Sequence, residues 1–244
     1  MYRILTVIFA VLIFAGCRSE TNTSDKIPVN FEDNGRFIPV IDEIIPLETN
    51  DTFLIGNNYA FKTTAKYYIL GDSEKILVFD KTGKAQSVIS PIGQGPNETS
   101  SVSFFHAGDN SIMIAAIGRK QIYEYDFEGN FIQAYNTSDN YFDFVSFNDL
   151  FLFDSQSRGT VHGNVLSIIN KEGETVNDTI PIIAEGTNYG KDKIQVYDEY
   201  ALFLPTMSDI IYKIGPTGHV SAAYSFDFGR YWLDSKESSE VSAN

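Results

Sequence analysis

A short sequence pattern recurs four times at a nearly constant spacing. Each copy has an apolar run, a polar turn that ends in glycine, and a second run. The four turn glycines are Gly83, Gly129, Gly173 and Gly218, at spacings of 46, 44 and 45 residues. A period of this length is typical of repeat architectures in which one supersecondary unit is used several times. The chain is therefore expected to repeat a single unit.

Each unit has the properties of a β-hairpin. Glycine stands where a tight turn needs a positive φ, and the flanking residues alternate or run apolar as strands do. A further apolar stretch precedes each hairpin, at residues 67–70, 111–115, 150–153 and 200–204. Residues 102–105 and 142–147 are candidates for a fourth strand. Blades of this kind predict an all-β protein, a β-propeller with four-stranded blades, because a β-sandwich has no reason to repeat one turn at a fixed period.

The charge balance excludes one class of partner. Lys and Arg total 18 against 32 Asp and Glu, a net charge of −14. Such a surface repels phosphates, so we expect no nucleic-acid binding. The single cysteine excludes an internal disulfide and a cysteine-based zinc site.

The N-terminus has the features of a secretory signal. Arg3 precedes an apolar run at residues 4–14, which is too short to cross a membrane as a helix. The sequence Phe14-Ala15-Gly16-Cys17 resembles the bacterial lipobox, although Leu is more usual than Phe at its first position. The resemblance implies cleavage after residue 16 and a lipid on Cys17; an ordinary signal peptide with an incidental cysteine is the alternative. The predicted membrane contact is then the lipid.

The rest of the chain divides by composition. Residues 17–36 read as the lipidated cysteine and a flexible polar tether, and residues 37–234 as the propeller blades. Residues 235–244 form a polar tail.

A loop between the first two repeats carries a family resemblance. It contains Gly93, Gly95, Pro96 and Glu98 in the sequence Gly-Gln-Gly-Pro-Asn-Glu. With residues 44–48 and 226–229, it is similar to the six-bladed β-propeller lipoproteins common in the Bacteroidetes, relatives of NHL-type propellers. Asn97 stands where that family more often has Gly. The resemblance covers residues 41–229 and implies a propeller in the bacterial envelope, anchored to the outer membrane. It does not distinguish the periplasmic from the outer face of that membrane, and it implies no settled activity.

The same loop is a poor nucleotide site. Glu98 stands where a dinucleotide fingerprint requires its third glycine, and Pro96 lacks the N–H that a phosphate would use. We therefore expect a structural turn between blades, and no cofactor.

The resemblance also raises a question of size. Six blades of about 45 residues would need roughly 270 residues, whereas residues 41–244 supply 204. We expect a truncated version of a longer relative; completion of the ring by a second copy is the alternative.

Few residues suggest catalysis. The three histidines, His106, His162 and His219, lie in different repeats, so a cluster in a central channel is possible, but unrelated positions are the favoured interpretation. His219 follows Gly218 and should lie at an outer turn. The scattered acidic residues lack the spacing of a calcium loop and are expected on a solvated surface: Asp42, Glu43, Asp139, Asp143, Asp192, Asp198 and Glu199. No catalytic or metal-binding residue is predicted.

Aromatic residues are the most suggestive feature for binding. Two groups precede the third and fourth repeats: Tyr135, Tyr141, Phe142, Phe144 and Phe147, then Tyr189, Tyr197 and Tyr200. Flat rings can stack on sugars or pack against peptides, but packing between blades uses the same residues and is the favoured interpretation.

These features predict a lipid-anchored, non-catalytic propeller that binds a protein or glycan. A propeller enzyme of the lyase or lactonase type, with a metal in the central channel, is the alternative, and a truncated copy without function is a third possibility. Convergence of His106, His162 or an acidic pair in the channel would favour an enzyme.

Overall fold

The computed structural model describes residues 26–30, 39–56, 60–137, 143–154, 165–177, 180, 192–206 and 208–229. The predicted signal peptide, Cys17 and the polar tail lie outside these residues. Within them, no helix is long and apolar enough to cross a membrane.

The strands form four sheets, each built on four antiparallel strands. The first sheet contains β2 (Ala60–Thr63), β3 (Tyr67–Gly71), β4 (Ile76–Asp80) and β5 (Ala85–Ile89). The second contains β6 (Phe105–Ala107), β7 (Ile112–Ala116), β8 (Gln121–Tyr125) and β9 (Phe131–Asn136). The third contains β10 (Asp143–Phe147), β11 (Leu150–Asp154), β12 (Leu166–Asn170) and β13 (Thr175–Asn177). The fourth contains β14 (Ile194–Val196), β15 (Ala201–Phe203), β16 (Ile210–Ile214) and β17 (Val220–Asp227), with β1 (Ile27–Pro28) at its edge.

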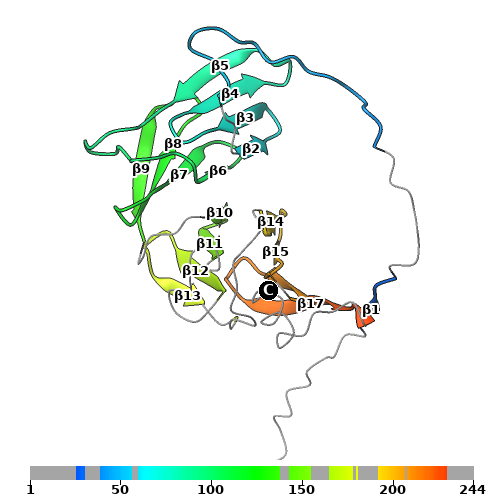
Figure 1. The fold of residues 1–244 in the computed structure, drawn as a ribbon. Coiled ribbons are helices and arrows are strands. Elements are labelled where there is room, and N and C mark those ends of the chain that lie inside the picture. The colour runs from blue at the N-terminus through cyan, green and yellow to red at the C-terminus, as the bar shows by residue number, and fades with distance from the viewer. Residues whose placement is uncertain are drawn as a thin grey trace, which may run out of the picture.

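The sheets follow one another around a common centre in chain order (Figure 1). The first strand of each sheet lies nearest the centre, and β6 contacts both β2 and β10, while β10 also contacts β14. Each sheet then runs outward strand by strand. This arrangement confirms the predicted all-β propeller with four-stranded units.

The repeated turns join the third and fourth strands of each sheet. Their glycines adopt φ values of 85°, 90°, 88° and 80° at Gly83, Gly129, Gly173 and Gly218. In each turn the glycine N–H donates to the carbonyl three residues earlier, at distances of 3.0–3.2 Å. The positive φ strongly favours glycine, which explains why this residue recurs at a fixed period.

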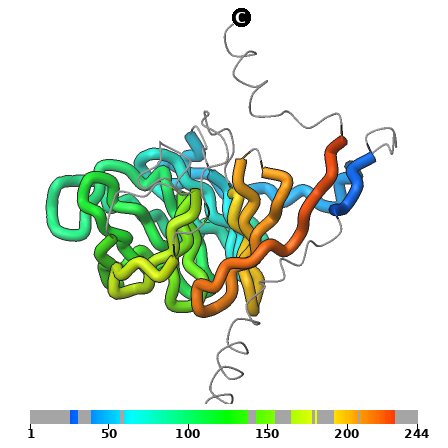
Figure 2. Tube along the Cα trace, turned by 90° about the horizontal axis from the view of Figure 1, so that it is seen from below, coloured from blue at the N-terminus to red at the C-terminus, as the bar shows by residue number. Residues whose placement is uncertain are grey.

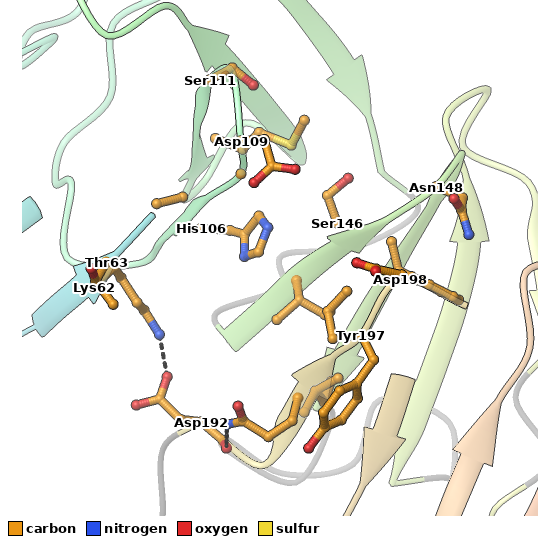
Figure 3. A pocket seen from close by; sticks show the side chains of 18 residues that line it. Lys62, Thr63, His106, Asp109, Ser111, Ser146, Asn148, Asp192, Tyr197 and Asp198 are labelled. Carbon is orange, nitrogen blue, oxygen red and sulfur yellow. Dashed lines mark hydrogen bonds and ion pairs between the residues drawn. The ribbon is translucent and has the colours of Figure 1, made fainter. Parts of the chain in front are cut away.

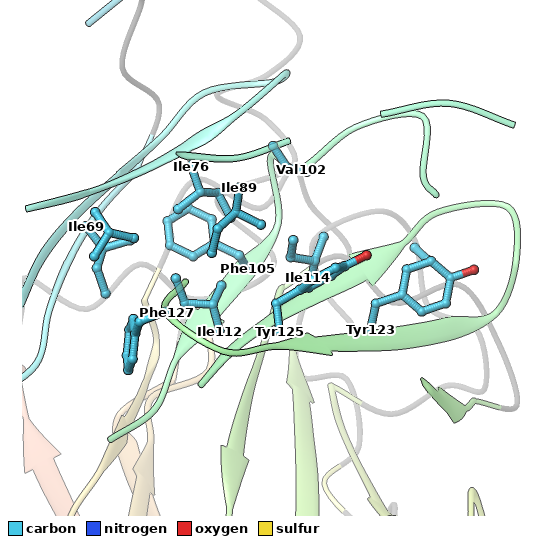
Figure 4. Packing of buried hydrophobic residues seen from close by; sticks show 12 residues of the cluster. Ile69, Ile76, Ile89, Val102, Phe105, Ile112, Ile114, Tyr123, Tyr125 and Phe127 are labelled. Carbon is cyan, nitrogen blue, oxygen red and sulfur yellow. The ribbon is translucent and has the colours of Figure 1, made fainter. Parts of the chain in front are cut away.

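Apolar faces pack sheet against sheet. Between the first and second sheets lies a cluster that includes Ile69, Ile76, Phe105 and Ile112 (Figure 4). Similar clusters lie around Phe151 and Phe153, and around Leu152 and Phe203. The middle strands are buried on both faces, so β7 and β11 are apolar along most of their length.

The N-terminal part of the described chain contacts the fourth and the first sheets and is not a free tether throughout. Ile27 pairs with Phe226 in a parallel β1–β17 ladder, visible in Figure 2 at the outer edge of the fourth sheet. Residues 39–56 then reach the first sheet, where the Glu48 N–H donates to the Gly83 carbonyl at 2.8 Å. The tether predicted for residues 17–36 therefore differs from the structure at Ile27–Pro28, because the exposed edge of β17 offers backbone partners.

Candidate functional site: the central cavity

A cavity of about 660 Å³ lies where the four sheets converge. Residues of β2, β6, β10 and β14, and of the turns that follow β6, β10 and β14, line it (Figure 3). Each sheet contributes its innermost strand, so the cavity exists only because the repeats surround one centre.

An ion pair joins the first and fourth sheets at this cavity. The Lys62 ammonium group on β2 binds the carboxylate of Asp192, which precedes β14 (Figure 3). Asp192 has a φ of 59°, in the left-handed region that Asp tolerates better than most residues. This pair neutralises a positive and a negative charge in the cavity wall.

A second group of charges lies at the boundary of the third and fourth sheets. Asp143 and Asp154 face each other directly across β10 and β11. The Asp154 carboxylate binds the Lys193 ammonium group at 3.0 Å, and Lys193 also donates to the Thr206 hydroxyl at 2.6 Å. Burial raises the pKa of Asp143, and repulsion from Asp154 and Asp192 raises it further. The pair Lys193–Asp154 therefore connects two sheets through buried charges.

His106 on β6 provides the imidazole of the cavity. Its ring lies between the first and third sheets, 6.4 Å from the ring of Phe144 (Figure 3). Burial, assisted by the nearby charge of Lys62, lowers the pKa of His106 to about 4. The imidazole is therefore neutral at pH 7 and offers one hydrogen-bond donor and one acceptor.

The turns that follow the inner strands contribute further side chains to the cavity. Asp109, Asn148, Tyr197 and Asp198 belong to these turns. The Tyr197 ring stacks on Tyr200 with centroids 4.9 Å apart and an interplanar angle of 25°. The Lys213 ammonium group lies over the ring of Tyr200, 4.4 Å from its centroid, and so restrains this ring. Tyr197 is 47% exposed, so an aromatic surface remains available.

The loop with the family resemblance lies away from the cavity. The Glu98 carboxylate accepts a hydrogen bond from the Gly95 N–H at 2.6 Å, and Arg119 donates to the carbonyls of Gln94 and Gly95. Asn97 has a φ of 60°, in the left-handed region that glycine adopts most easily, which agrees with the glycine that the similar propellers more often have at this position. Within this loop, which lies between β5 and β6, the Gly93 N–H donates to the Thr99 carbonyl at 3.1 Å and the Glu98 N–H to the Gly95 carbonyl at 3.3 Å.

The three histidines, whose convergence would favour an enzyme, differ in their positions. His106 lines the cavity, His219 is exposed at the β16–β17 turn, and His162 lies outside the described residues. Across the residues with a described position, no group of three His, Cys, Asp or Glu side chains could hold a metal ion.

One expectation about side chains needs correction. The solvated surface predicted for Asp143 is wrong, since this residue is partly buried beside Asp154 and Asp192. The favoured interpretation of the aromatic residues, packing between blades, is confirmed for Tyr135, Phe144 and Phe147, which are at most 8% exposed. Tyr197 is 47% exposed and lines the cavity, as the buried Phe147 also does. Tyr141, Phe142, Tyr189 and Asp139 lie outside the described residues.

Sequence reasoning missed Lys62, Asp154 and Lys193. Asp154 carried a weak signal, because it ends the apolar run Leu150–Asp154 and so enters a buried strand. The other two residues have no comparable signal, since isolated lysines are usually exposed.

Comparisons with known proteins concern the family and the fold. A family model described as "Domain of unknown function (DUF4934)" matches residues 28–244. No curated protein matches the chain. A candidate exported protein from Bacteroides fragilis has 18% identity and a TM-score of 0.63, over 75% of this chain and 55% of that one.

Two further solved structures are more distant. A DUF4221-family member from Bacteroides vulgatus has 14% identity and a TM-score of 0.47, over 78% of this chain and 62% of that one. Virginiamycin B lyase from Staphylococcus aureus has 15% identity and a TM-score of 0.46, over 73% of this chain and 58% of that one. The chain thus spans between half and two-thirds of the length of these three structures.

Proposed function

Because the chain belongs to the DUF4934 family and folds as a β-propeller, we propose that it is a non-catalytic binding module that takes a ligand into its central cavity. The observation that carries this proposal is the cavity itself, with walls from all four sheets. Its volume of about 660 Å³ lies within the range of roughly 300–1,000 Å³ usual for small-molecule sites.

The wall combines rigidity with varied chemistry. Its strands are fixed by the apolar packing between sheets and by the ion pair of Lys62 and Asp192. The neutral imidazole of His106 and the Tyr197 ring add directional contacts to this frame. A preformed site of this kind binds without a large cost for ordering its own side chains.

We place this module in the bacterial envelope, attached to the outer membrane through a lipid on Cys17. The signal-like residues 1–16 and the lipobox-like sequence before Cys17 support this placement. The description of the Bacteroides fragilis structure as a candidate exported protein agrees with it. A ligand would then come from the envelope or from outside the cell.

Protection of the cavity from a thiol reagent tests the proposal. In the full chain, Ser146→Cys places a thiol on β10 in the cavity wall, and Glu128→Cys places one on an exposed turn as a matched control. Peptide mass spectrometry distinguishes both from Cys17. The soluble glycan and small-molecule fraction of isolated envelopes should slow maleimide labelling several-fold at position 146 and not at position 128. Equal labelling rates at position 146 with and without this fraction would refute a binding role for the cavity.

A further inference from the structure

We infer that the ligand of the central cavity is an uncharged oligosaccharide, held by hydrogen bonds to its hydroxyls and by stacking on Tyr197. The inference rests on the proposed function, because it names the chemistry of the ligand for the same cavity. It follows from the charge, the hydrogen-bonding groups and the aromatic surface of the wall.

The charges of the wall oppose an anionic ligand. Lys62 is the one Lys or Arg among the described lining residues, and its ammonium group is already paired with Asp192. Asp109 and Asp198 add two carboxylates. Phosphates or uronic acids would therefore meet excess negative charge on a protein whose net charge is already −14.

The interior offers neutral groups that suit hydroxyls. The imidazole of His106 is uncharged at pH 7 and supplies both a donor and an acceptor. Ser146 and Asn148 lie on the same wall (Figure 3). Gln195 uses one amide hydrogen on the Asp192 carbonyl at 3.0 Å, and its amide oxygen can still accept a hydrogen bond. A sugar hydroxyl both donates and accepts, so it can pair with each of these groups.

The aromatic surface supplies the remaining element of sugar recognition. Tyr197 lines the cavity while its ring rests on Tyr200, and Lys213 holds Tyr200 in turn. The ring is therefore oriented before a ligand arrives, and little rotamer freedom is lost on binding. The apolar face of a pyranose ring can stack on such a surface.

A cationic ligand fits the same wall less well. Tyrosine and carboxylates can also bind ammonium groups. However, Asp192 is neutralised by Lys62, and the other two lining carboxylates, Asp109 and Asp198, belong to exposed turns. Exposed carboxylates are well solvated, so they would add little to the binding of an ammonium group, whereas His106, Ser146 and Gln195 can each pair with a hydroxyl.

The test compares oligosaccharides that differ in charge. The purified full-length protein in detergent is applied to an array of neutral, amine-bearing and acidic oligosaccharides, including N,N′,N″-triacetylchitotriose, chitotriose and trigalacturonate. We expect binding to neutral members and none to trigalacturonate. Calorimetry with the best neutral member then gives the affinity of each variant.

Two tyrosines make a matched pair of variants. Tyr197 and Tyr224 are each 47% exposed, but only Tyr197 belongs to the cavity wall described here. Tyr197→Ala should weaken binding about tenfold, and Tyr224→Ala should leave it unchanged. His106→Leu should weaken binding roughly three- to tenfold through the loss of its hydrogen bonds.

The outcomes separate the two proposals. Binding confined to amine-bearing or acidic members, and weakened by Tyr197→Ala, would overturn the neutral-sugar inference and leave the cavity as a binding site. Neutral-sugar binding that is indifferent to both Tyr197→Ala and His106→Leu would overturn the cavity as its location. If no neutral oligosaccharide on the array binds, the inference on ligand chemistry is overturned. The thiol-protection experiment decides independently whether the cavity binds anything.

Discussion

Lys193 and Asp154 form a buried ion pair across the boundary between the third and fourth sheets. Their charged atoms are 3.0 Å apart, and their side chains are 9% and 1% exposed. Asp154 also faces Asp143 across β10 and β11. The positive charge of Lys193 therefore offsets the repulsion between these two carboxylates. The ion pair thus couples these two neighbouring sheets.

Removal of Lys193 should therefore destabilise the fold. Lys193→Met leaves the Asp154 carboxylate buried without its cation, and the free energy of unfolding should fall by about 3–5 kcal/mol. Urea unfolding followed by tyrosine fluorescence or circular dichroism measures the change. Lys26→Met removes the exposed partner of Asp209 and serves as the control, with little expected effect. Equal effects of the two variants would contradict the structural role of the Lys193–Asp154 pair.

Asp143 should make stability depend on pH in a direction unusual for a carboxylate. Its folded-state pKa is raised above 3.8, so the folded protein holds this proton more tightly than the unfolded chain does. The stabilisation from this group is full below about pH 3.8 and is lost as the pH rises through the raised pKa. Asp143→Asn, uncharged at every pH, should be more stable than the parent at pH 7, with a gain that shrinks on acidification.

Chemical unfolding of both proteins across this pH range measures the difference. Asp42→Asn, at an exposed carboxylate outside the sheets, is the matched control. If Asp143→Asn is no more stable than the parent at pH 7, the repulsion between Asp143 and its acidic neighbours is not a destabilising interaction.

The pKa of His106 should respond to Lys62. Burial is the larger cause of its low pKa of about 4, and the charge of Lys62 is the second. Lys62→Met should therefore raise the pKa of His106, while burial keeps it below 6.5. Titration of the ring protons by nuclear magnetic resonance gives this value directly, and Lys62→Arg, which retains the charge, should leave it low. An unchanged pKa in Lys62→Met would mean that Lys62 does not influence the cavity imidazole.

The segment at residues 39–56 should make Gly83 more sensitive to substitution than Gly118. Both glycines have a φ near 85°, so alanine would be strained at either position. A Cβ at position 83 would also lie 2.1 Å from the Pro46 carbonyl oxygen, whereas one at position 118 would have no atom within 4 Å. Each substitution should cost about 1–2 kcal/mol from strain alone, and Gly83→Ala should cost more. Thermal unfolding compares them; equal losses would show that residues 45–47 do not pack firmly on the first sheet.

The repeating architecture could be predicted from the sequence because its determinants are local. A left-handed turn favours glycine, and a strand buried on both faces needs an apolar run such as Ile76–Asp80. Both signals lie within a few residues of each other, so they are readable without knowing what packs against them. The period of about 45 residues then implied one blade per repeat.

The cavity was decided by the tertiary structure. Lys62 and Asp192 are 130 residues apart and meet only because separate repeats place their innermost strands around one centre. Tyr135 on β9 is buried, whereas Tyr197, in the turn after β14, lines the cavity, and the residue type does not distinguish the two positions. Local chemistry thus determined the sheets, whereas the packing of sheet against sheet determined which side chains share the cavity, because that choice depends on contacts between residues far apart in the chain.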